Sequence, residues 1–228
     1  MSNFLKKYKH FLFIVYLPVY MYCFLWLEAR KDLDFTNIHC GLDDKIPFLE
    51  IFIIPYLLWF LYVIVIIVYL FFQTDHLEDY YKCVFTLMSG MTTCLFIYYI
   101  FPNMQQMRPV SFTHQNICID IIQFIYKSDT DTNVFPSIHV FNAVAVHVGF
   151  VTSYGFRKKK GWKMASRILC ILICLSTMFL KQHSLLDVLG GLFLYGIYGT
   201  MNYILFPKWR SRGKITGDDH YADRHKGI

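Results

Sequence analysis

Charged residues are scarce in this chain. Lys, Arg, Asp and Glu make up only 17% of the 228 residues, whereas 56% are hydrophobic. A soluble domain carries roughly a quarter of charged residues, so the composition excludes an ordinary soluble domain. The length fits one membrane domain and leaves no room for a second folded unit.

Other absences narrow the classes of function. The seven cysteines lack metal-ligand spacing, and no carboxylate cluster is placed to hold Mg²⁺, so we expect neither a metal nor a cofactor. No internal repeat is visible, whereas inverted repeats with broken helices would suggest a transporter. The net charge of +6 comes from basic residues beside apolar runs, which indicates orientation in a membrane rather than nucleic-acid binding.

What the sequence does contain is long apolar runs. Several reach the roughly 20 residues that a membrane-spanning helix needs. We predict an all-α, polytopic membrane bundle with six spans, because an unclosed strand cannot satisfy its backbone in lipid. The first run has no small-residue cleavage site after it, so we expect an uncleaved anchor. The spans cover about 10–27, 51–72, 82–101, 136–154, 164–181 and 185–206.

The loops sort by charge. An even number of spans puts the basic segments 6–9, 157–163 and 208–214 on one side, which the positive-inside rule makes cytoplasmic. The acidic first loop then lies outside and is expected to be solvated. We divide the chain into an anchor helix with an outer loop (1–50), a catalytic membrane core (51–206) and a cytoplasmic basic tail (207–228). We expect a multi-pass plasma-membrane protein.

Five polar residues from separate segments should meet at the outer face. Span three leaves through "FPNMQQMRPV", span four enters through "FPSIHV", and "KQHSLLDVLGG" joins spans five and six. This topology gathers Arg108, Ser137, His139, His183 and Asp187. Each alone also fits a structural role, as a snorkelling anchor, a helix cap or an interfacial polar group. Ionisable residues that converge at this depth indicate a functional site.

Together these residues suit phosphoryl transfer. Asp187 follows His183 by four residues, so it can fix the tautomer of His183 and leave the other ring nitrogen free to attack. His139 can protonate a leaving oxygen. Arg108 offers a forked donor that suits phosphate. Ser137 adds a hydroxyl beside the free N–H groups at the start of span four.

The motifs resemble those of the type-2 phosphatidic acid phosphatase superfamily, whose members include lipid phosphatases and vanadium haloperoxidases. The resemblance rests on "FPNMQQMRP", "PSIH" and "STMFLKQHSLLD", in this order, and covers roughly residues 50–206. It implies that His183 is the nucleophile and forms a phosphohistidine, that Asp187 orients it, and that His139 is the general acid. It also implies that Arg108 and Ser137 hold phosphate oxygens.

Two departures from the family pattern remove positive charge. Phe101 stands where the family has Lys, and Thr177 stands where it has Arg. Lys181 lies four residues after Thr177, on the same helix face and nearer the outer rim. We therefore predict that Lys181 reaches the phosphate.

The leading interpretation is a metal-independent membrane phosphatase that hydrolyses a lipid phosphomonoester or diphosphate at the extracytoplasmic side. By resemblance, candidate substrates are phosphatidate, phosphatidylglycerophosphate and undecaprenyl diphosphate. The first alternative is a phosphotransferase of the inositolphosphotransferase type, which passes the phosphoryl group to an alcohol. The second is a non-catalytic membrane protein or transporter with a decayed site. Expected partners are the lipid substrate and membrane lipids, with no nucleic acid.

Overall fold

The computed structural model describes residues 12–205. Within this range it contains seven α-helices, two short strands and several single helical turns. The helices are α2 (Leu12–Glu28), α3 (Ile53–Phe72), α4 (Leu77–Ile100), α5 (Ile117–Ser128), α6 (Ile138–Thr152), α7 (Lys160–Phe179) and α8 (Leu185–Thr200). The strands β1 (Thr36–Asn37) and β2 (Asn103–Met104) pair in parallel, and a π-helical turn, η5 (Met201–Leu205), follows α8.

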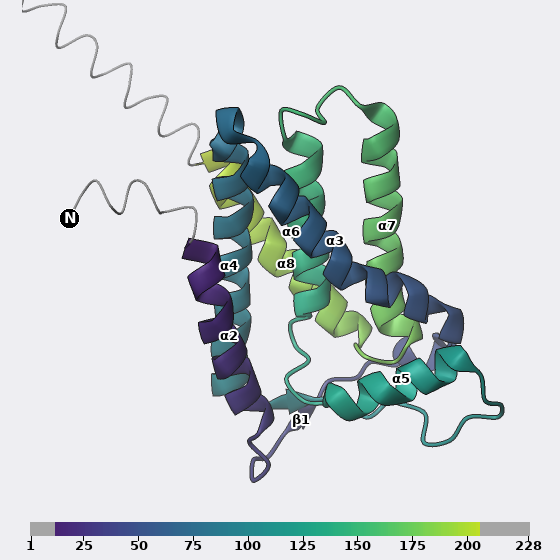
Figure 1. The fold of residues 1–228 in the computed structure, drawn as a ribbon. Coiled ribbons are helices and arrows are strands. Elements are labelled where there is room, and N and C mark those ends of the chain that lie inside the picture. Colours follow the sequence, from purple (N-terminus) through teal and green to yellow (C-terminus); the bar gives the residue numbers. More distant parts are fainter. Residues whose placement is uncertain (1–11, 206–228) are drawn as a thin grey trace, which may run out of the picture.

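Six of these helices form the bundle, and α5 crosses one end of it (Figure 1). Four segments are long and apolar enough to cross a membrane, namely Glu50–Phe72, Leu77–Ile100, Lys160–Phe179 and Leu185–Leu205. The first and fourth predicted spans correspond to shorter apolar helices, Ile14–Glu28 and Ile138–Thr152. The predicted all-α membrane fold is therefore confirmed, while the count of six spans stays a prediction.

Helix α6 forms the centre of the bundle and packs against α3, α4, α7 and α8. A helix that is apolar all round is typically buried in this way, and Val140, Phe141, Ala143, Ala145 and Val146 are all fully buried. Small residues on its neighbours let them approach closely. A Cβ atom added at Gly90 in α4, for example, would lie 1.8 Å from the ring of Phe141.

The end of the bundle opposite the basic link 157–163 holds a helix that the sequence analysis did not predict. Asn116 caps α5 by accepting a hydrogen bond from the N–H of Ile119 at 3.0 Å. Ile119 and Ile122 then bury the apolar face of α5 against Ile53, Tyr56 and Leu180. Helix α5 thus folds back over the ends of α3 and α7 instead of extending into solvent.

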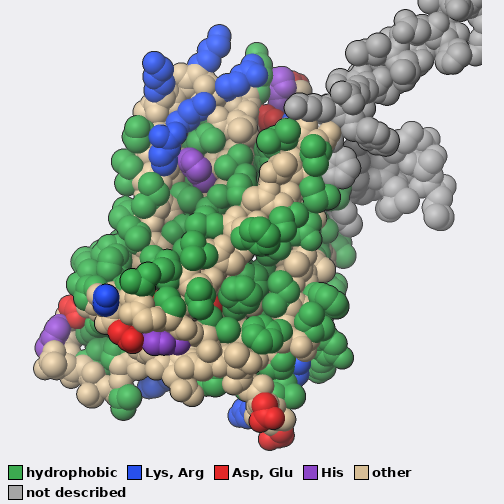
Figure 2. All heavy atoms as spheres, turned by 180° about the vertical axis from the view of Figure 1, so that it is seen from behind, with side chains coloured by type: hydrophobic (Ala, Val, Ile, Leu, Met, Phe, Trp, Pro, Cys, Tyr) green, Lys and Arg blue, Asp and Glu red, His purple; other side chains and the backbone are tan. Residues whose placement is uncertain are grey.

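Basic side chains gather at the opposite end of the bundle (Figure 2). The basic link 157–163 joins α6 to α7 there, far from α5 (Figure 1). This separation is the one that the charge pattern predicts, although which end faces the cytoplasm stays a prediction. The predicted basic tail, 207–228, lies outside the described residues, and the three-part division of the chain also stays a prediction.

Candidate active site

The starts of α6 and α8 meet at the end of the bundle that carries α5. Ser137 caps α6 by accepting from the N–H of Val140 at 3.4 Å, and Ser184 caps α8 by accepting from the N–H of Leu186 at 3.1 Å. The N–H of Ser137 donates to the carbonyl of Asp187 at 3.0 Å, which ties the two helix starts together. Two helix N-termini therefore direct positive partial charge toward one place.

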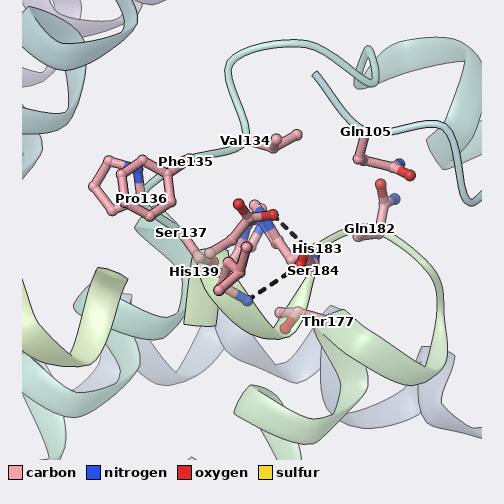
Figure 3. A network of polar contacts seen from close by, with 12 residues as sticks. Gln105, Val134, Phe135, Pro136, Ser137, His139, Thr177, Gln182, His183 and Ser184 are labelled. Carbon is pink, nitrogen blue, oxygen red and sulfur yellow. Dashed lines mark hydrogen bonds and ion pairs between the residues drawn. The ribbon is translucent and has the colours of Figure 1, made fainter. Parts of the chain in front are cut away.

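The two predicted catalytic histidines are in contact at this place (Figure 3). Nδ1 of His139 lies 3.2 Å from Nε2 of His183, and Nδ1 of His183 lies 3.3 Å from Oδ2 of Asp187. Asp187 is fully buried. Because its carboxylate can only accept, it keeps the proton on Nδ1 of His183 and leaves a lone pair on Nε2. The structure thus brings together the three residues to which the sequence assigned the chemistry.

The link between α7 and α8 sets the position of His183. The carbonyl of Thr177 accepts hydrogen bonds from the N–H groups of Gln182 at 2.9 Å and His183 at 3.0 Å. The hydroxyl of Thr177 donates to the carbonyl of Cys174 at 2.8 Å. Thr177, which stands at the family's Arg position, is fully buried, and its hydrogen bonds hold the backbone around the site.

Arg108 reaches the same rim, with its terminal nitrogens directed at protein oxygens. One nitrogen donates to the carbonyls of Tyr126 at 3.2 Å and Asp129 at 2.8 Å. The other donates to the carbonyl of Thr130 at 2.8 Å and to the side chain of Gln182. Nε of Arg108 is buried and has no hydrogen-bond partner, so the protein itself takes up all the terminal N–H groups of this guanidinium and encloses the remaining one.

Lys181 lies against the loop that joins α2 to α3. Its ammonium donates to the carbonyls of Asp43 at 2.8 Å and Ile46 at 2.5 Å. The structure therefore does not bring the Lys181 ammonium into hydrogen-bond contact with His139 or His183. Its predicted contact with phosphate stays a prediction.

Asp43 belongs to the loop that we expected to be solvated, yet its side chain is buried. Its carboxylate accepts from the N–H of Leu185 at 2.8 Å, the hydroxyl of Ser184 at 2.6 Å and the N–H of Cys40 at 2.8 Å. Burial by itself raises the pKa of Asp43, but these hydrogen bonds outweigh it and hold the pKa below its ordinary value. Asp43 is therefore a buried anion at the start of α8.

The sequence analysis missed three residues near His139, two of which contact it and one of which contacts it through Tyr56. The hydroxyl of Tyr56 in α3 lies 3.1 Å from Nε2 of His139 and 3.5 Å from Oδ2 of Asp129. The ring of Trp59 lies 4.4 Å from that of His139, measured between centroids. Tyr56 is one aromatic residue among many in an apolar run, and Asp129 follows the unpredicted helix α5. No motif or spacing in the sequence distinguishes these three positions from their neighbours.

A buried amide holds the loop that precedes α6. Oδ1 of Asn103 accepts from the N–H groups of Val134 at 2.8 Å and Phe135 at 2.7 Å, while Nδ2 donates to the carbonyl of Phe101 at 2.7 Å. Phe101, at the family's Lys position, thus contributes a backbone carbonyl. These bonds fix the loop that leads to Ser137.

A cavity of about 270 Å³ opens beside the histidines. His139, His183 and Gln182 line its polar end. Apolar side chains of α2, α3 and α4 line much of the rest, among them Met21 and Phe60, which are exposed on the outside of the bundle. The loop before α6 adds polar side chains, namely Asp129, Thr130, Thr132 and Asn133. The cavity thus connects the polar site with the apolar surface between α2 and α3.

The family model of the PAP2 superfamily matches residues 84–212, more than half of the chain. The chain belongs to the PAP2 superfamily. This confirms the family predicted from the motifs and, with the apolar helices, an integral membrane protein. Membership in the PAP2 superfamily supports a phosphatase or phosphotransferase type of function on a lipid phosphate. No curated protein and no solved structure matches the chain.

The part of the chain that matches the PAP2 superfamily begins in α4, so α2 and α3, which line the cavity, lie before it. Within residues 12–205, no group of three or more His, Cys, Asp or Glu side chains is arranged to hold a metal ion. That catalysis needs no metal stays a prediction.

Proposed function

We propose that this protein is a lipid-phosphate phosphatase that hydrolyses a phosphomonoester or diphosphate through a phosphohistidine. The observation that carries the proposal is the continuous contact from His139 through His183 to Asp187, beside a mostly apolar cavity. A nucleophile, an acid and an orienting carboxylate thus lie within hydrogen-bond reach of one another.

In the first half of the proposed reaction, Nε2 of His183 attacks phosphorus and forms an N–P bond. The bond from phosphorus to the lipid oxygen breaks, and His139 gives that oxygen a proton from Nδ1. Asp187 stabilises the positive charge that develops on the His183 ring. The phosphoryl group is expected to enter between the two imidazoles, which lie 3.2 Å apart without it.

In the second half, water attacks the phosphohistidine. His139 takes a proton from the water, and phosphate leaves as the N–P bond to His183 breaks. We propose that Arg108 and Ser137 bind phosphate oxygens, together with the N–H groups at the start of α6. The contact of Arg108 with Gln182, which lines the cavity beside His183, supports a place for its charge near the phosphate. Lys181 adds positive charge to the same rim.

An amphiphile suits the cavity. A phosphate group at the polar end would meet His139, His183 and Gln182, while an apolar chain would leave between α2 and α3. Phosphatidate, phosphatidylglycerophosphate and undecaprenyl diphosphate remain the candidate substrates. The end that carries α5 would face outward at the plasma membrane.

A second hollow favours the phosphotransferase as the alternative function. This hollow, of about 290 Å³, lies between α3 and α5, and Leu57, Ile125 and Ser128 line it together with His139. It therefore reaches His139 from a second direction. An acceptor alcohol that entered there would replace water in the second half of the reaction.

Phosphate release by purified protein in detergent tests the proposal. The panel contains the three candidate lipids and glycerol 3-phosphate, without added alcohol, and His183→Ala serves as the blank. We expect phosphate release from at least one lipid by the wild type only. Transfer to an added alcohol without release to water would indicate the phosphotransferase. An inert wild type under both conditions would overturn catalysis altogether.

A further inference from the structure

His139 has a protein partner at each ring nitrogen. Nδ1 faces His183 at 3.2 Å, and Nε2 faces the hydroxyl of Tyr56 at 3.1 Å. The Tyr56 hydroxyl also reaches Oδ2 of Asp129 at 3.5 Å. A row of contacts therefore runs from Asp129 through Tyr56 to Nε2 of His139, the ring nitrogen that does not contact His183.

The proton on His139 follows from these contacts. Asp187 accepts from Nδ1 of His183, so Nε2 of His183 is an acceptor. The proton between the two imidazoles therefore belongs to Nδ1 of His139, the atom that would protonate the leaving oxygen. Tyr56 then decides what happens at the other nitrogen of His139.

A phenol hydroxyl can serve both charge states of His139, because it donates one hydrogen bond and accepts another. When His139 is neutral with its proton on Nδ1, Tyr56 donates to its Nε2. When His139 is an imidazolium, Nε2 donates to the Tyr56 oxygen, and the Tyr56 O–H turns to the carboxylate of Asp129. That carboxylate then offsets the positive charge through one intervening hydroxyl.

We infer that Tyr56 and Asp129 are positioning residues that allow His139 to carry the extra proton needed for general-acid catalysis. The inference rests on the proposed phosphatase or phosphotransferase function. In the first half-reaction, the Nδ1–H bond of the His139 imidazolium breaks and the O–H bond of the leaving alcohol forms. In the second half, the proton of the attacking water returns to Nδ1, so protons balance over the cycle.

The same arrangement gives α5 a role. Asp129 follows α5, and its backbone carbonyl accepts from Arg108 at 2.8 Å while its carboxylate reaches Tyr56. Asp129 thus links Arg108, which we propose binds the phosphate, to His139, which we propose protonates the leaving group. Helix α5 positions both by folding back over the bundle.

The test varies the leaving group. Phosphatidate releases an alcohol that needs a proton, whereas 4-nitrophenyl phosphate releases a phenolate that scarcely needs one. General acids contribute about 10²–10⁴-fold to rate, so loss of the acid's support should affect only the first substrate strongly. For Tyr56→Phe we expect a fall of at least about tenfold in kcat on phosphatidate, with little change in KM and little loss on 4-nitrophenyl phosphate.

Tyr62→Phe is the matched control. Tyr62 lies on the same helix, and its hydroxyl contacts Ser166 at 2.6 Å, away from the site. It should leave both rates unchanged. Asp129→Asn should repeat the pattern of Tyr56→Phe, and His139→Ala should repeat it more strongly. If Asp129→Asn fails to fold, Tyr56→Phe alone decides, because it removes one oxygen atom.

Each outcome has a consequence. Equal losses on both substrates, or no loss, in Tyr56→Phe would overturn the inference. If His139→Ala shows the dependence on leaving group and Tyr56→Phe does not, the proposed function stands and the role of Tyr56 falls. A wild type that turns over neither substrate, in water or with an added alcohol, would overturn the proposed function and this inference with it.

Discussion

The carboxylate of Asp43 accepts a hydrogen bond from the hydroxyl of Ser184 at 2.6 Å, across 141 residues of sequence. A second oxygen of Asp43 accepts from the N–H of Leu185 at 2.8 Å. The carboxylate therefore lies at the positive end of the α8 dipole. Its partner Ser184 directly follows the proposed nucleophile His183 in the sequence. A loop that precedes the matched family region thus fixes the start of α8.

Replacing Asp43 with Asn should change stability in a pH-dependent way. A pKa lowered in the folded state means that the carboxylate stabilises the fold fully above its unfolded pKa of about 4, and that this stabilisation disappears as pH falls through the lower folded pKa. Asp43→Asn should therefore unfold more easily at neutral pH, by about 1–3 kcal/mol, and lose less on acidification.

Thermal unfolding in detergent between about pH 3 and 7 measures both effects. Asp44→Asn is the control, because Asp44 is the exposed neighbour and contacts only His39 among the described side chains. If the two variants gave the same pH profile, the buried anion would not have the role described here.

The close approach of α6 and α8 gives a second prediction. A Cβ atom added at Gly191 would lie 2.7 Å from the carbonyl oxygen of Ser137 and 3.2 Å from Cβ of Val140. Because backbone cannot yield there without separating the helices, Gly191→Ala should cost about 1–3 kcal/mol and lower activity. Gly196→Ala on the same helix meets nothing within 4 Å and should be harmless. Equal behaviour of the two variants in unfolding and turnover would refute the close packing.

Lys181→Met separates two roles of this lysine. If Lys181 binds phosphate, the variant should be inhibited more weakly by inorganic phosphate. If Lys181 instead anchors the loop between α2 and α3, the variant should unfold at a lower temperature. Because its ammonium binds the carbonyls of Asp43 and Ile46, we expect a lower unfolding temperature and an inhibition constant within about twofold of the wild type. A large rise in the inhibition constant would instead support the contact with phosphate that the sequence suggested.

Much of this architecture could be predicted because lipid leaves few choices. The apolar runs had to be helices, and their alternation placed Arg108, His139 and His183 at one end. The bundle and the contact between His139 and His183 bear out that reasoning about position, while the chemical roles remain proposals.

Other features depend on contacts that no local pattern reveals. Helix α5 is only 12 residues long, too short for a span. Its apolar face is buried only because Ile53 and Leu180 pack against it, and the local sequence does not show this contact. Asp43 resembles its solvated neighbour Asp44 in sequence and differs only through its partners at the start of α8. Tyr56 likewise differs from the other tyrosines of α3 only because His139 lies opposite.

Trapping of the phosphoenzyme tests the central claim most directly. Wild-type protein is mixed with a lipid substrate carrying ³²P in the reactive phosphate and quenched during turnover, with His183→Ala treated in parallel. The account predicts label on the wild type that is stable in base, is lost in acid and maps to His183, with no label on the variant. Label on His183→Ala, or wild-type turnover without any label at His183, would contradict it.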